Sequence, residues 1–348
     1  MPVLEPPGFP TGNLATQDLV SISRYLNDPT MVLRALRTIA EQLFVGNKVL
    51  TGQFFTQDGS IIYEQIESIF AGNVPQGVQP GDEYPLTPVP TGPAQIANVV
   101  KWGLDTIITD ESISRQNFDV LSRAFIKIVN SMVQQVDSVI MSAVVAAITQ
   151  KQAAGATTPG GSGSVNYYWD GSGSAKPNIV RDIMMAQEQL RNLKQGYLAD
   201  TVLVDTGTYA LALSDPTIAL QWPREDMGSR GVTGAPVFQG IGTSYGMDLA
   251  GNLWLSTPNL PSTPYCAVLD RKVFGAMVDE RLPAPGYVGA QSDGGSGDDD
   301  GRSMIQVKTM REDKQDRWRI RCRRVTTPIV IEPKAGVEIT AFTAAAPT

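Results

Sequence analysis

Residues 110–150 read DESISRQNFDVLSRAFIKIVNSMVQQVDSVIMSAVVAAITQ. Apolar residues recur along this stretch at spacings of three and four, which is the period of one helical face. They are Phe118, Leu121, Phe125, Ile128, Met132, Val136, Val139 and Ile140. The pattern predicts a single helix over about 117–148, on the order of 48 Å long. Such a helix is longer than usual for a globular domain, so we expect it to organise the fold.

The segment before this helix is acidic and irregular. Between 49 and 100 there is no Lys or Arg, and the net charge is −5. The stretch GQFFTQDGSIIYEQ (52–65) places Asp58 and Gly59 between two β-rich runs, which predicts a hairpin. A Pro/Gly-rich stretch follows, and AQIANVVKWGLDTIIT (94–109) then predicts a long strand. So long an excursion is typical of an arm that finds its partners on another chain.

Helices and strands alternate after the long helix. A Gly/Ser-rich connector at 153–176 precedes a predicted helix at 178–197, a strand at 201–205 and a helix at 206–214. Further strands are predicted around 252–258, 265–270 and 273–280. This order indicates an α+β fold. Cys266 and Cys322 are the only cysteines. We expect both to be reduced and buried. The sequence does not decide whether they form a disulfide.

Four arginines alternate along RWRIRCRR (317–324), at positions 317, 319, 321 and 323. The preceding REDKQD (311–316) predicts a turn between two strands. The arginines could form the solvated face of a half-buried strand, with Trp318, Ile320 and Cys322 inward. They could also bind DNA, but the net charge of −7 disfavours a dedicated nucleic-acid binder. We favour pairing with carboxylates of another chain, because arginine's planar fork suits carboxylates at an interface.

Motifs of catalysis are not found. The chain has no histidine, which removes Ser-His-Asp and Cys-His catalysis and histidine metal sites. It has no GxxxxGK[ST] phosphate loop, no GxSxG elbow and no CxxC pair. We therefore predict no catalytic, cofactor-binding or metal-binding residues, although carboxylate or lysine chemistry would survive. No run of 18 apolar residues predicts a membrane span.

Taken in order, these segments resemble the major capsid proteins of tailed double-stranded DNA phages, which have the Johnson fold. YPLTPVPTGPAQIANVVKWGLDTIITDESISRQNFD (84–119) is similar to the returning strand of the extension loop and the start of the spine helix. VDERLPAP (278–285) and MIQVKTMREDKQDRWRIRCRRVTTPIVIEP (304–333) are similar to the passage from the axial into the peripheral domain. The resemblance covers essentially the whole chain and is strongest to phages of actinobacteria.

The resemblance implies an α+β Johnson fold with four parts. Residues 1–46 would be the N-terminal arm and 47–112 the extension loop. The peripheral domain, with its long spine helix, would comprise 113–175 and 304–348, and the axial domain 176–303. The implied function is a non-enzymatic major capsid protein that self-assembles into the icosahedral head shell around double-stranded DNA. A Johnson-fold encapsulin-type nanocompartment shell and a soluble enzyme with an unrecognised carboxylate site are the alternatives.

The resemblance also implies partners. The chain would assemble with itself as pentamers and hexamers in the host bacterial cytoplasm and remain in the virion. A separate scaffolding protein and a portal are expected, and the binding of decoration proteins is left undecided. The shell would enclose DNA without sequence-specific binding, and no membrane would take part. The acidic loop of a neighbour would lie near the basic strand. Arg317, Arg319, Arg321 and Arg323 are therefore predicted to receive carboxylates from neighbouring subunits, with Glu64 and Glu67 as the leading candidates.

Overall fold

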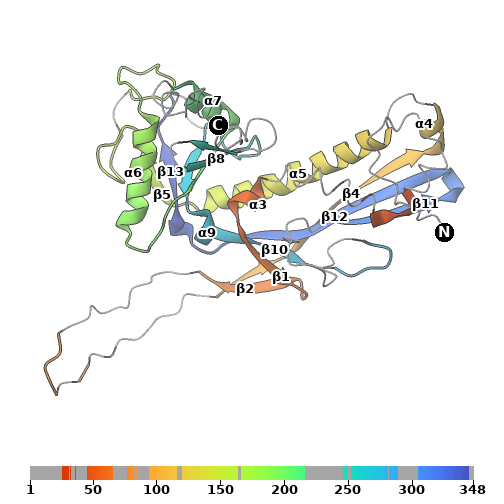
Figure 1. The fold of residues 1–348 in the computed structure, drawn as a ribbon, viewed down its shortest axis with the longest axis horizontal. Helices are drawn as coiled ribbons and strands as arrows, with labels where there is room; N and C mark the ends of the chain where they lie inside the picture. Colours follow the sequence, from red (N-terminus) through yellow and green to blue (C-terminus); the bar gives the residue numbers. More distant parts are fainter. Residues whose placement is uncertain are drawn as a thin grey trace, which may run out of the picture.

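Two sheets and one long helix organise the chain (Figure 1). The structure is a computed structural model. It describes residues 26–30, 32, 36, 45–65, 77–81, 83–84, 86, 94–115, 120–163, 166–215, 246–249, 252–280, 282–288 and 305–344.

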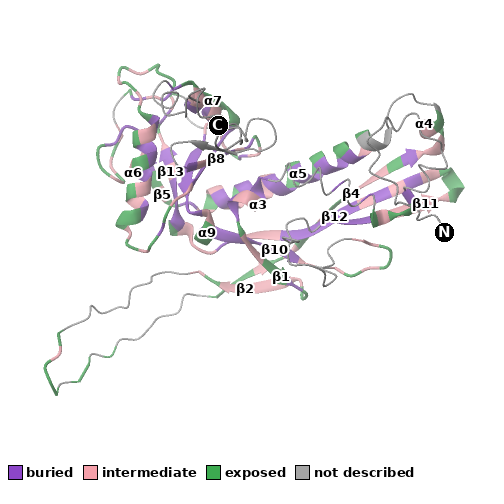
Figure 2. Cartoon of the chain, in the orientation of Figure 1, coloured by how far each residue is buried: buried purple, intermediate pink, exposed green. Residues whose placement is uncertain are grey.

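The long helix is α5, Val120–Ala147, with 28 residues. Its buried stripe contains Phe125, Ile128, Met132, Val136 and Ile140, so the predicted helical face is confirmed over this length. Figure 2 shows the opposite side of α5 exposed along much of the helix. By length and composition alone part of α5 could cross a membrane, but half of that window is buried inside the protein. Burial of one stripe against a sheet is the behaviour of a core helix.

The first sheet has five strands and lies under α5. Its order is β1–β10–β12–β11, and β4 pairs with the other edge of β12. The strands are β1 Gly52–Thr56, β10 Gly275–Glu280, β12 Arg317–Val330, β11 Gln306–Glu312 and β4 Val100–Thr109. The short helix η3, Asp313–Gln315, joins β11 to β12, which confirms the predicted turn. Strand β12 pairs with β4, β11 and β10 and is therefore the centre of this sheet.

The second sheet has six strands in the order β5–β13–β9–β6–β8–β7. They are β5 Gln150–Ala153, β13 Gly336–Thr340, β9 Cys266–Leu269, β6 Thr201–Val204, β8 Asn252–Ser256 and β7 Gly246–Leu249. The helices α6 Ile179–Asn192, α7 Thr206–Ser214 and α9 Arg271–Phe274 accompany them. The helices and strands predicted between 178 and 280 are thus confirmed. Cys266 and Cys322 lie in different sheets, and both are free and buried.

The predicted hairpin around Asp58 and Gly59 is wrong. Strand β1 pairs in parallel with β10, whereas β2, Ser60–Glu64, pairs with β3, Ala94–Asn98. The chain does bend at residues 57–59, where Gly59 adopts a φ of 73°. However, Ile61 and Tyr63 of β2 pack on a cluster formed by Ala276, Val278 and Ile329. Burial of these side chains, together with the pairing of β1 to β10, outweighs the local preference for a hairpin.

The two sheets take strands from several of the predicted parts of the chain. The strand β4, within the range 47–112, pairs with β12 over ten residues. The strand β10, within 176–303, also joins the five-stranded sheet, while β5 and β13 join the six-stranded one. Three short helices complete the described elements: α3 Gly46–Val49, α4 Asp110–Arg115 and η4 Pro333–Ala335. Strand pairing therefore connects segments that are far apart in the sequence.

Candidate functional site: the arginine ladder of strand β12

The arginine ladder consists of Arg317, Arg319, Arg321 and Arg323, which share one face of β12 because side chains alternate along a strand. The intervening Trp318, Ile320 and Cys322 are buried in the main core, which also contains residues of α5. The ladder therefore lies on the sheet face opposite α5. The side chains of its first three members are 28%, 34% and 38% exposed.

Two carboxylates from the flanking strands contact the ladder. Asp105 of β4 lies opposite Arg321 and accepts hydrogen bonds from its Nε at 2.7 Å and its Nη2 at 2.8 Å. Arg319 also donates from Nε to Asp105 at 2.7 Å. Glu312 of β11 lies opposite Arg317, pairs with it, and accepts a bond from Nη1 of Arg319 at 3.3 Å. The chain thus forms a continuous row of alternating charges across three strands.

These contacts fix the charges of the row. The hydrogen bond from Arg321 is the largest cause that lowers the pKa of Asp105, although partial burial opposes it. The hydrogen bond from Arg317 likewise lowers the pKa of Glu312. Both carboxylates are consequently ionised at neutral pH. Lys308 lies opposite Arg321 on the same face, so five cations face two carboxylates, which leaves a net charge of +3 among these groups.

Arg323 is the buried end of the ladder. Its Nε donates to Oε1 of Gln306 at 2.7 Å, and its Nη2 donates to the carbonyl of Leu282 at 2.6 Å. Its guanidinium lies 3.7 Å from the centre of the Tyr287 ring, which is close enough for a cation–π interaction. Arg323 therefore fixes residues 282–288 against the sheet and offers less to an outside partner than the other three arginines.

A protein-family model described as phage capsid protein matches residues 92–339, more than two thirds of the chain. The chain belongs to the phage capsid protein family. The capsid protein is similar in fold to a virus-like particle from Pyrococcus furiosus, with a TM-score of 0.51, 10% identity, and coverage of 88% of this chain and 96% of that chain. It is also similar to the capsid of cyanophage P-SCSP1u, with a TM-score of 0.51, 13% identity, and coverage of 85% and 86%.

At these identities the two structures show the fold alone, and they confirm the Johnson fold expected from the sequence. No curated protein sequence matches the capsid protein. The family match supplies the function: the capsid protein is a shell subunit of a phage head, as its sequence indicated.

Within one subunit, the residues predicted for the inter-subunit contact do not all lie together. Glu64 is exposed at the end of β2, in a different sheet from the ladder, and Glu67 lies outside the described residues. Asp105 and Glu312, which do contact the ladder, were not predicted. The register of GLDTI (103–107) opposite RIRCR (319–323) decides the position of Asp105, and it cannot be read from either segment separately.

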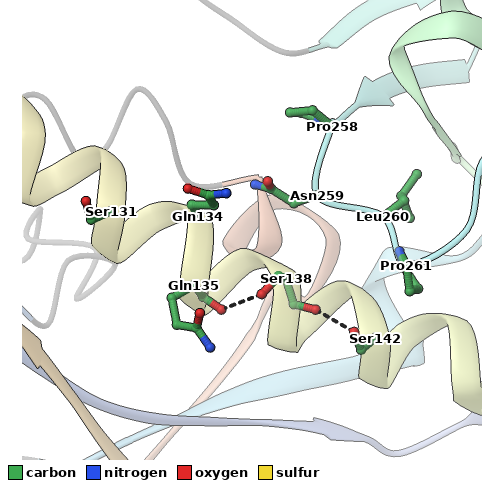
Figure 3. Close-up of a pocket in the computed structure, with 9 residues that line it drawn as sticks. All are labelled: Ser131, Gln134, Gln135, Ser138, Ser142, Pro258, Asn259, Leu260 and Pro261. Atoms are coloured by element: carbon green, nitrogen blue, oxygen red, sulfur yellow. Dashed lines mark hydrogen bonds between the residues drawn. The ribbon is translucent and has the colours of Figure 1, made fainter.

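A second surface feature of the capsid protein is a polar groove between α5 and residues 258–261 (Figure 3). Its volume is about 360 Å³, and its lining residues are Ser131, Gln134, Gln135, Ser138, Ser142, Pro258, Asn259, Leu260 and Pro261. The hydroxyls of Ser138 and Ser142 donate to helix carbonyls at 2.9 and 2.7 Å. None of these lining side chains is ionisable, so they supply no general acid or base.

Proposed function

We propose that this capsid protein closes an icosahedral shell around double-stranded DNA as pentamers and hexamers, without catalysing a reaction. The assignment of residues 1–46 as arm, 47–112 as extension loop, 113–175 with 304–348 as peripheral domain and 176–303 as axial domain belongs to this proposal. So do assembly in the host cytoplasm and the participation of a separate scaffolding protein and a portal. The family match is the observation that carries it.

The extension of the chain supports assembly through neighbours. Ile62 and Ile96 pair directly across β2 and β3, and each is 68% exposed. Tyr84 and Leu86 are 78% and 88% exposed. Figure 1 shows the described residues 77–81 far from the two sheets. A two-stranded ribbon is marginal by itself in water, and apolar side chains exposed to this degree gain stability when a second copy of the chain covers them.

The distribution of charge supports a specific contact between copies. Residues 49–100 carry −5, and Figure 1 places the tip of this segment at the end of the molecule opposite β11. The ladder keeps a positive surplus after its contacts with Asp105 and Glu312. We therefore propose that carboxylates of a neighbour, with Glu64 and Glu67 as candidates, reach Arg317, Arg319 and Arg321. Each exposed pair contributes about 0–1 kcal/mol. Because the contact is repeated in every subunit of the shell, the summed contribution stabilises the assembly.

Electron microscopy of the purified protein, with and without its scaffolding protein, tests the assembly. We expect closed shells, or capsomers of five and six subunits. A protein that remains monomeric at high concentration with scaffold present would contradict the proposal. The contents of purified particles separate a phage head from an encapsulin-type compartment, since packaged cargo enzymes in place of DNA would favour the latter.

Charge reversal tests the contact at the ladder. Arg319→Glu and Arg321→Glu together should abolish assembly while the subunit stays folded by circular dichroism, and Glu64→Lys with Glu67→Lys should partly restore it. Because both arginines also bind Asp105, the milder pair Arg319→Gln and Arg321→Gln separates misfolding from lost assembly. Arg191→Glu, at the exposed end of α6, is the control for charge reversal elsewhere. Normal assembly with loss of DNA retention only would show that the ladder faces the genome.

A further inference from the structure

A fully buried carboxylate of α5 holds the segment that leads into the first strand. Oδ2 of Asp137 accepts a hydrogen bond from the backbone N–H of Val45 at 3.0 Å, and Oδ1 accepts one from Gly46 at 3.2 Å. These two residues begin the helix α3, which Figure 1 shows against α5. Both bonds therefore join α5 to the segment that enters α3.

When both carboxylates are ionised, Asp137, Asp279 and Arg324 together carry a net charge of −1, and all three side chains are buried. Arg324 of β12 exerts the attraction that reaches Asp137, but its Nε and Nη2 donate to both oxygens of Asp279 in β10, at 3.1 and 3.3 Å. Nη2 of Arg324 also donates to Asn47 of α3 at 3.1 Å. The side chains of Arg324 and Asp279 are each 1% exposed. The guanidinium of Arg324 thus binds Asp279 directly and attracts Asp137 without a hydrogen bond between them. Lys48 is the cation of α3, and burial lowers its pKa.

The backbone of Gly46 is closely packed against α5. A Cβ added to Gly46 would lie 2.4 Å from Cδ1 of Ile140 and 3.0 Å from Oδ1 of Asp137. The backbone of Gly46 therefore lies directly against α5 and leaves no room for a side chain beside the carboxylate.

We propose that Asp137 is a proton-linked latch, whose neutral carboxyl holds residues 45–46 on α5 most firmly and whose ionisation loosens this junction. The reason is desolvation: a buried surplus of negative charge is relieved by binding one proton. The proton balance is simple. Opening the junction hydrates the carboxyl, which then releases its proton to solvent.

The pKa values of Asp137 in the closed and open forms determine whether a higher pH favours or opposes opening. Burial raises the pKa of Asp137 to about 6, and the two backbone hydrogen bonds and Arg324 oppose this only in part. In the open form the carboxyl returns to about 3.9. The closed form thus binds the proton more tightly, and opening becomes easier as the pH rises. Between pH 4 and pH 8 the opening equilibrium should increase on the order of 50-fold, levelling above about pH 6.

Hydrogen exchange of the Val45 and Gly46 amides in the full-length, unassembled subunit tests the latch. After correction for intrinsic exchange, the opening constant should rise on the order of 50-fold from pH 4 to pH 8, and Asp137→Asn should abolish this dependence. Asp182→Asn, which changes another buried aspartate on α6, should leave the rise intact. A pH-independent wild type, or an unchanged rise in Asp137→Asn, would overturn the proposal.

A titration of the wild type keeps the test valid if Asp137→Asn does not fold. The ¹³C shift of the Asp137 carboxyl, assigned through bonds, should titrate with a midpoint near 6. A midpoint near 4 would show that the closed junction has no preference for the proton, and the latch would be excluded.

Discussion

Asp105 contacts two members of the arginine ladder at once, and this position gives one residue control over the spacing of both guanidinium groups. A bidentate contact fixes the plane of Arg321 as well as its position. The part of each guanidinium group that stays exposed, 28–38% for the first three side chains, is thereby held in a defined position. At the scale of single residues, the intrachain carboxylate prepares the surface on which a neighbour's carboxylates are proposed to bind.

Replacing Asp105→Asn should lower the free energy of unfolding of the subunit by about 1–2 kcal/mol at pH 7, because the charged hydrogen bonds from Arg319 and Arg321 are lost. The pKa of Asp105 is lowered in the folded protein, so its contribution is fully present above the ordinary carboxyl pKa of about 3.9 and is lost as the pH falls from there through the lowered pKa of the folded state. Urea unfolding at several pH values measures this. A difference from wild type that persisted undiminished at pH 2 would exclude an electrostatic origin.

Gly46 shows a different constraint, which is steric. Its replacement by alanine should destabilise the subunit by about 1–3 kcal/mol, because the new methyl group would overlap the side chain of Ile140. Ile140→Val removes the nearest atom, so the double variant should lose less than the sum of the two single changes. Gly77→Ala, whose Cβ would meet nothing within 4 Å, is the matched control and should be neutral in thermal unfolding. Strict additivity would contradict the overlap.

Among the elements, the long helix was readable from the sequence because its apolar period is local. The strands after 200 were readable for the same reason, and so was the inward face of β12 with Trp318 and Ile320. The partners of β1 and β2 were not, because β1 pairs with β10 about 220 positions further along the chain. The contacts of Asp105 and Asp137 share this cause: a carboxylate 90 to 220 positions from its donors leaves no spacing that a sequence pattern could reveal.

In the Gly/Ser-rich connector, the described residues 153–163 and 166–176 make contacts that its composition does not indicate. Trp169 donates from Nε1 to Asp182 at 2.7 Å, and the amide of Gly155 donates to the same carboxylate at 2.9 Å. The Trp169 ring also packs against that of Phe342, with ring centres 4.7 Å apart and the planes tilted by 37°. The connector is thus tied to α6 and to the residues after β13. A buried carboxylate that serves two donors compensates for the low apolar content of this element.

Trp169→Phe should loosen the connector, because it keeps most of the ring contact but deletes the donor to Asp182. We expect a loss of about 1–3 kcal/mol in the free energy of unfolding. Faster limited proteolysis within 153–176 should accompany it. Tyr168→Phe, which changes a partly buried neighbour, is the control. Unchanged proteolysis and stability in Trp169→Phe would mean that the hydrogen bond to Asp182 does not hold the connector.

Across the whole molecule, the interior and the extension are stabilised in different ways. The two sheets and α5 share one continuous apolar core, whereas the ribbon of β2 and β3 touches a small separate cluster. Gln65, which directly follows β2, also donates a hydrogen bond to the carbonyl of Val330 in β12 at 3.2 Å. The subunit can therefore fold around its core, while the extension depends on contacts that other subunits would provide.

The chemistry of this extension predicts how the shell is held together. Some relatives in the phage capsid family join a lysine of the extension loop to an asparagine of a neighbour through an isopeptide bond. Here residues 49–100 contain no lysine. The nearest are Lys48, half-buried in α3, and Lys101, exposed on β4 at the base of the extension. A lysine at the base of the extension does not reach a neighbouring subunit together with the tip. We therefore expect that the subunits are held together by non-covalent contacts alone. Heads boiled in SDS should give one band near 37.4 kDa. A ladder of multimers would contradict this, and its loss in Lys48→Arg or Lys101→Arg would identify the amine responsible.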